Sequence, residues 1–107
     1  MLIISDSSFR KRLTALYRYI VKYTVTNRIY NQEVVRDRIL EKAKFLARVF
    51  LLKSNKKFIA DTVRVKDIFL ENYSVIIIIK YSDSVFKPED KYCSFEFNES
   101  GKLFILE

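Results

Sequence analysis

The residue types that usually carry out chemistry at an active site are nearly absent from this chain of 107 residues. It has no His, no Trp and a single Cys, Cys93. Without His, acid-base catalysis would need a carboxylate or a Lys with a strongly shifted pKa. A lone Cys cannot form an intramolecular disulfide, and a zinc site would need carboxylates or a second chain. We therefore expect no catalytic residue, no metal ligand and no cofactor, and a reducing compartment.

Two further absences narrow the class of protein. The only Gly is Gly101, whereas glycine-rich phosphate-binding loops need several positions without a Cβ. The longest apolar run, Val75 to Ile79, is far below the ~20 residues of a membrane-spanning helix, and the N-terminus lacks the basic residues of a secretion signal. The expectation is a soluble, cytoplasmic protein with no membrane span, in which binding is favoured over catalysis.

Charge is divided unevenly along the chain, whose net charge is +7. Residues 1–57 contain fourteen Lys and Arg against four acids, whereas residues 58–107 contain six against nine. A basic first half should attract nucleic acid, anionic lipid or an acidic protein surface. The alternative is that this charge only keeps the outer faces of two helices soluble.

The first of these helices is predicted over residues 7–23, with Ser5, Asp6 or Ser7 as its N-cap. The run Tyr23 to Thr26 is aromatic and β-branched, which favours an end of the helix near residue 23. Apolar side chains recur at helical spacing and predict one buried stripe, made of Phe9, Leu13, Leu16, Tyr17 and Ile20.

A cationic ridge is predicted on the other side of this helix. Lys11, Arg18 and Lys22 stand at i, i+7 and i+11, and the helix contains no acid that could neutralise them. With Arg28 in the following connection they are the predicted binding residues, for an acidic partner or for phosphates. Aromatic rings lie near these cations in the sequence, at Tyr17, Tyr19, Tyr23 and Tyr30. They could stack on nucleic-acid bases, or they could belong to the edge of the core while the cations are solvated.

A second helix is predicted from a cap at Asn27 or Asn31 to about Lys53. The segment Phe45 to Leu52 is apolar except for Arg48, which predicts that the last two turns are covered on more than one side. The expected core stripe consists of Val35, Ile39, Lys42 or Ala43, Leu46 and Phe50.

After Phe58 the apolar pattern changes from helical to strand-like. A first strand alternates from Thr62 to Lys66, and Ile68 to Leu70 break the alternation as a bulge or a strand end would. Glu71 and Asn72 are expected to form a turn. Tyr73 to Tyr81 contains four consecutive Ile residues, which predicts a central strand covered on both faces.

The last part of the chain predicts a hairpin. Cys93, Phe95 and Phe97 alternate with polar residues, Asn98 to Gly101 form the turn, and Leu103 to Leu106 form the final strand. The whole chain, 1–107, is therefore expected to be a single α+β domain. In it, two N-terminal helices pack on a four-stranded antiparallel sheet.

The hairpin Phe95-Glu96-Phe97-Asn98-Glu99-Ser100-Gly101-Lys102-Leu103-Phe104-Ile105-Leu106 resembles the end of proteins in the nuclear transport factor 2-like superfamily. The resemblance extends over roughly the last 75 residues. It implies a curved, cone-like sheet wrapped on a long helix, an apolar pocket and a homodimer formed through the sheet. No catalytic residue of that superfamily can be placed on this chain by motif.

Three smaller candidates remain. Asp61 and Asp67 share strand parity with apolar residues, so a regular strand would bury two carboxylates; the favoured alternative is a bulge near Lys66 that leaves both in solvent. Cys93 is expected to be a small core residue. The run Ile76 to Ile79 could pair with a second copy of the chain, or could simply be core.

The leading functional hypothesis is a non-catalytic binding or assembly module that uses its basic helical side to engage an acidic partner. The second is nucleic-acid binding by the same ridge. The third is a small-molecule pocket, with or without enzymatic activity, inside a curved sheet.

Overall fold

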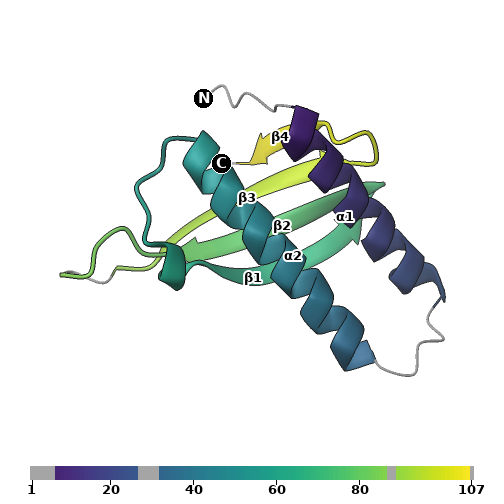
Figure 1. The fold of residues 1–107 in the computed structure, drawn as a ribbon, viewed down its shortest axis with the longest axis horizontal. Helices are drawn as coiled ribbons and strands as arrows, with labels where there is room; N and C mark the ends of the chain where they lie inside the picture. The colour runs from purple at the N-terminus through teal and green to yellow at the C-terminus, as the bar shows by residue number, and fades with distance from the viewer. Residues whose placement is uncertain (1–6, 27–31, 87–88, 107) are drawn as a thin grey trace.

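The computed structural model describes residues 7–26, 32–86 and 89–106 (Figure 1). Two helices, α1 (Ser7–Thr26) and α2 (Gln32–Lys53), precede a short 3₁₀ helix (Ala60–Thr62). The strands are β1 (Arg64–Glu71), β2 (Ser74–Tyr81), β3 (Lys91–Asn98) and β4 (Leu103–Leu106). They form one antiparallel sheet in the order β1-β2-β3-β4, and both helices lie on the same face of it. The predicted α+β architecture is confirmed, but the sheet is open, with β1 and β4 as its edges, and does not close into a cone.

Helix α1 places the predicted apolar stripe in the core, since all five of its residues are buried. The helix continues to Thr26, so the predicted end near residue 23 is wrong. Each β-branched residue costs a helix only a few tenths of a kcal/mol, which is too little to stop a helix that is already packed. Ser7 is the first helical residue, and the alternative caps Ser5 and Asp6 lie outside the described residues.

Helix α2 ends at Lys53, as expected, through a turn that satisfies its last carbonyls. Asn55 has a left-handed φ of 56°, and the N–H of Lys56 donates to the Leu51 carbonyl at 3.1 Å. The buried Ser54 hydroxyl donates to the Phe50 carbonyl. The caps predicted for its start, Asn27 and Asn31, lie outside the described residues.

The core stripe of α2 uses one of the two residues predicted as alternatives. Ala43, not Lys42, completes the core stripe, and Leu46 and Phe50 are buried as expected. The last turns of α2 are covered on two sides, by α1 and by the sheet, as predicted, although Phe45 is 47% exposed and Leu52 is 68% exposed on the remaining flank. The helix has the sheet below it and α1 on one flank, which leaves its outer flank without a neighbour among the described residues (Figure 1).

Strand β1 contains the bulge that the sequence suggested. The register with β2 shifts between Val65 and Asp67, at Lys66. Because one extra residue is absorbed there, Ile68 and Leu70 turn toward the core and the strand continues to Glu71. The turn that follows consists of Asn72 and Tyr73, both at positive φ (51° and 63°), a type I′ hairpin turn. The expected turn at Glu71 and Asn72 is therefore off by one residue.

Strand β2 is central, with β1 and β3 on either side of it, but only one of its faces is covered. Val75, Ile77 and Ile79 are 0% exposed, whereas Ile76 and Ile78 are partly exposed. The prediction that both faces are covered is wrong because both helices pack on the same side of the sheet (Figure 1).

The core lies between this covered face and the helices. Phe50 of α2 stacks on Phe95 of β3, with ring centroids 4.5 Å apart and an interplanar angle of 16°, and Phe97 follows at 5.9 Å from Phe95. The inward side chains of β2 and β3 at these positions are fully buried. They fill the space under the helices, and none of them lines either of the two concavities described below.

The β3–β4 turn is fitted against the start of α1. Gly101 has φ 77°, and a Cβ there would lie 2.6 Å from the Arg10 carbonyl oxygen. The Gly101 N–H donates to the Asn98 carbonyl at 2.9 Å, and Arg10 Nε donates to the Ser100 carbonyl at 3.1 Å. A glycine is required here both for the left-handed backbone and for the close approach of the helix.

We expect Gly101→Ala to lower the free energy of unfolding by about 1–3 kcal/mol, because the new methyl group meets helix backbone at a strained φ. Urea denaturation followed by circular dichroism measures the effect. Glu99→Ala, at an exposed position of the same turn, should stay within about 0.5 kcal/mol of the parent chain. Equal stability of the two variants would contradict the close packing of the turn.

Three titratable groups gather where β2 and β3 meet the loop between them. Burial raises the pKa of the Cys93 thiol, and nearby Lys56 opposes this. Burial also raises the pKa of the Tyr81 phenol. A hydrogen bond from Lys91 Nζ to the Asp83 carboxylate, 3.0 Å long, raises the pKa of Lys91. Folding thus favours the neutral thiol and phenol and the charged ammonium.

A raised folded-state pKa contributes stability that is complete below the unfolded-state pKa and is lost as pH rises. All three groups act in this direction, so the urea midpoint should be level near pH 7 and fall between about pH 8.5 and pH 11. Cys93→Ala should delay the onset of the fall. A midpoint that is constant or rises up to pH 10 would be inconsistent with these environments.

Candidate functional site

Helix α1 has basic side chains and no acidic ones. It contains five Lys and Arg and no Asp or Glu. Three of the predicted binding residues, Lys11, Arg18 and Lys22, are exposed, as the spacing predicted. The fourth, Arg28, lies outside the described residues.

Lys11 and Arg18 line one concavity, which we call the α1 hollow. Its volume is about 550 Å³. It lies along the outer side of α1 and reaches the β3–β4 turn, and its lining contains three cations and no acid. The lining residues are Ser7, Arg10, Lys11, Thr14, Ala15, Arg18 and Ser100.

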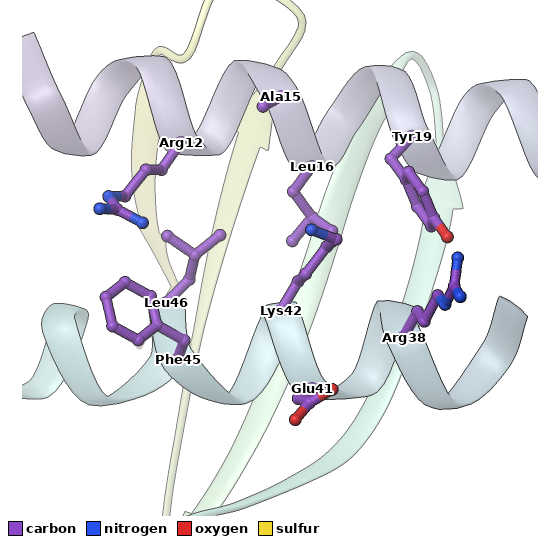
Figure 2. A pocket seen from close by; sticks show the side chains of 9 residues that line it. All are labelled: Arg12, Ala15, Leu16, Tyr19, Arg38, Glu41, Lys42, Phe45 and Leu46. Carbon is purple, nitrogen blue, oxygen red and sulfur yellow. The ribbon is translucent and has the colours of Figure 1, made fainter. Parts of the chain in front are cut away.

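A second concavity, the interhelical groove, runs between α1 and α2 and has a volume of about 730 Å³ (Figure 2). Its floor is apolar, because Leu16 and Leu46 are both almost fully buried. Its walls contain three cations and a single acid, Glu41. The complete lining is Arg12, Ala15, Leu16, Tyr19, Arg38, Glu41, Lys42, Phe45 and Leu46.

Cations and rings alternate across the groove. The Arg12 guanidinium from α1 lies 4.9 Å from the centroid of the Phe45 ring on α2. In the opposite sense, Lys42 Nζ from α2 lies 5.6 Å from the Tyr19 ring on α1. These cation–π contacts are worth about 0.5–1 kcal/mol each at exposed sites. They direct both cations, which remain exposed, across the groove toward the opposite helix (Figure 2).

Tyr19 leaves one polar atom without a partner. Its hydroxyl oxygen is buried and makes no hydrogen bond within the described part of the chain. Figure 2 shows it at the Arg38 end of the groove. A buried unsatisfied hydroxyl costs about 1–3 kcal/mol, and a ligand oxygen that reached it would recover part of that cost.

Ala15 is part of the lining of both concavities. Ala15 is exposed and has a small side chain, so a ligand that crossed it would reach both concavities. Together the linings contain six cations, Arg10, Lys11, Arg12, Arg18, Arg38 and Lys42, against one acid, Glu41. This concentration of one sign creates a local potential that favours anions, most strongly at low salt.

Only part of this surface was predicted from the sequence. Lys22 lines neither concavity; its Nζ lies 5.7 Å from the Tyr23 ring, nearer the end of α1. Arg10, Arg12, Arg38 and Lys42 were missed. Arg10 and Arg12 flank Lys11 in an Arg-Lys-Arg run, which could have been recognised in the sequence as a basic cluster. Arg38 and Lys42 join the site only because α2 packs beside α1.

The smaller candidates do not form sites. Asp61 and Asp67 are both exposed, which confirms the favoured alternative of a bulge near Lys66. Cys93 is half-buried on the helix-facing side of β3 and packs against the core. Among the described residues, no group of three or more Cys, Asp or Glu is placed to hold a metal ion. None of the helices described is long and apolar enough to cross a bilayer.

No family model matches this sequence, and neither the curated proteins nor the solved structures compared with it give a match. The resemblance of the C-terminal hairpin to the nuclear transport factor 2-like superfamily therefore stays a prediction.

Proposed function

We propose that this protein is a non-catalytic binding module that holds an acidic segment of a partner protein across α1. The observation that carries the proposal is that the α1 hollow and the interhelical groove share the lining residue Ala15 and together have six cations and one acid around them. A segment that crosses Ala15 would place carboxylates near Arg10, Lys11 and Arg18 on one side and near Arg12 and Lys42 on the other.

The apolar part of the groove indicates what else the segment contains. Phe45 is the most exposed large apolar residue of the lining, and Leu16 and Leu46 form the floor beneath it. An apolar side chain between acids would remove the Phe45 ring from water, and the flanking carboxylates would pair with the cations. The preferred ligand is thus an acidic peptide with an apolar anchor, and a purely charged polymer should bind less well.

Nucleic acid is the second candidate, supported by the acid-free row of Lys11, Arg18 and Lys22. It is less favoured because single-strand binding gains most from free aromatic faces on which bases stack. In the groove, Arg12 already covers one face of Phe45 and Lys42 one face of Tyr19. The cations alone would give weak binding that depends steeply on salt.

Ala15→Glu should weaken binding of a fluorescent peptide rich in Asp, Glu and Leu by about tenfold, which is about 1.4 kcal/mol. The new carboxylate enters both concavities, and Glu is a good helix former. Ala60→Glu is the matched control, because it makes the same substitution at an exposed position of the 3₁₀ helix. Fluorescence anisotropy at fixed salt measures both variants. Equal losses would mean that only net charge matters, and the proposed site would be wrong.

Glu41→Gln should act in the opposite direction. Removal of the one acid in the groove lining relieves like-charge repulsion at an exposed position and should tighten binding of the same peptide about twofold.

A thymidine oligonucleotide of similar charge should bind more weakly than the peptide at every salt concentration. If instead it binds more tightly, with a loss on Lys11→Gln and Arg18→Gln, the nucleic-acid function replaces the one proposed.

A further inference from the structure

The buried hydroxyl of Tyr19 lies in a fixed position at one end of the interhelical groove. Its ring contacts the Tyr23 ring, with centroids 4.5 Å apart and an interplanar angle of 51°, and the Lys42 ammonium lies 5.6 Å from its centroid. The hydroxyl can turn to water only if both contacts break. Its oxygen has no hydrogen-bond partner within the described part of the chain. A buried donor held in this way is an anchor point for a ligand oxygen.

Two cations of α2 stand beside this hydroxyl. Arg38 and Lys42 are four residues apart, so they lie on the same face of α2, and both line the groove with Tyr19. Figure 2 shows the Arg38 guanidinium opposite the Tyr19 hydroxyl, and the one acid of the lining, Glu41, turned away from α1. Both cations are exposed. Their side chains can therefore shift to admit a ligand oxygen next to the hydroxyl.

We propose that Tyr19, Arg38 and Lys42 form a phosphoryl subsite, and that the acidic segment bound across α1 contains a phosphoserine. This inference rests on the proposed function and specifies one residue of the ligand. The subsite offers a hydroxyl donor, a planar guanidinium that binds two oxygens, and a compact ammonium. A phosphate monoester has three terminal oxygens and a charge of about −1.5 to −2 at pH 7, so it can use all three groups. A carboxylate has two oxygens and a single charge, and it gains less.

The geometry of the groove sets the position of the phosphoserine in the segment. Figure 2 shows Phe45 toward one end of the groove and Tyr19 with Arg38 toward the other, with Ala15 between them. Arg38 and Phe45 are seven residues apart on α2, which is about 10 Å along the axis. An extended segment that crosses Ala15 directs successive side chains to opposite sides. The phosphoserine is therefore next in sequence to the apolar anchor.

Fluorescence anisotropy of the full chain with a set of acidic peptides tests the proposal. Each peptide has one Leu anchor among Asp and Glu, with Ser, Glu or phosphoserine directly before or directly after the Leu. In one of the two placements phosphoserine should bind about tenfold more tightly than Glu. If Glu peptides bind and phosphoserine adds nothing in either placement, the subsite is wrong and the proposed function stands. If no peptide of the set binds, both are wrong.

A matched pair of variants tests the hydroxyl itself. Tyr19→Phe should lower the affinity for the phosphoserine peptide about fivefold and that for the Glu peptide by less, about twofold. Tyr23→Phe removes a hydroxyl one turn further along α1, outside the groove lining, and should change neither. The urea midpoint of Tyr19→Phe should not fall, because the lost hydroxyl has no partner in the described chain.

Three results would overturn the subsite. Equal losses for both peptides on Tyr19→Phe would mean that the hydroxyl does not distinguish phosphate from carboxylate. A fall in the urea midpoint would mean that the hydroxyl stabilises the fold. A fivefold loss of binding to the thymidine oligonucleotide on the same substitution would assign the subsite to a nucleic-acid phosphodiester instead.

Discussion

The burial of one face of a small antiparallel sheet under two helices is the constraint on which the rest of the molecule depends. Val75, Ile77 and Ile79 of β2 and Phe95 and Phe97 of β3 are fully buried, and Phe50 of α2 stacks directly on Phe95. A chain of this length has only one core of useful size. Both helices must therefore contribute to the same layer, which places them side by side and leaves their outer sides and the far face of the sheet available.

That shared layer explains the distribution of charge. Helix α1 buries its apolar stripe in the core. Its cations stay outside the core, because the free-energy cost of burying an unpaired charge is far too high. They are held at the surface of α1, and the neighbouring α2 adds Arg38 and Lys42 in the interhelical groove. Contacts of Arg12 with Phe45 and of Lys42 with Tyr19 keep these cations over the groove. A basic surface thus follows from core packing, and its shape follows from the position of α2.

The position of the helices also explains why the other face of the sheet is uncovered. With both helices on one side, Ile76, Ile78 and Phe69 remain partly exposed, although their sequence context resembles that of buried residues. The prediction of a strand covered on both faces failed here because four consecutive Ile residues do not reveal how many layers surround a sheet. The closed, cone-like sheet implied by the family resemblance is likewise not formed, since four strands leave β1 and β4 as free edges.

Local patterns in the sequence determined the two helices, the four strands, the bulge at Lys66, the buried stripe of α1 and the exposure of Lys11, Arg18 and Lys22. These features depend on spacing and on near-neighbour chemistry, which the order of residues contains. Only the tertiary structure decided which face of the sheet is covered, and that Arg38, Lys42 and Phe45 of α2 complete a groove begun by α1. Residues that far apart in the chain become neighbours through core packing, and no local pattern encodes that.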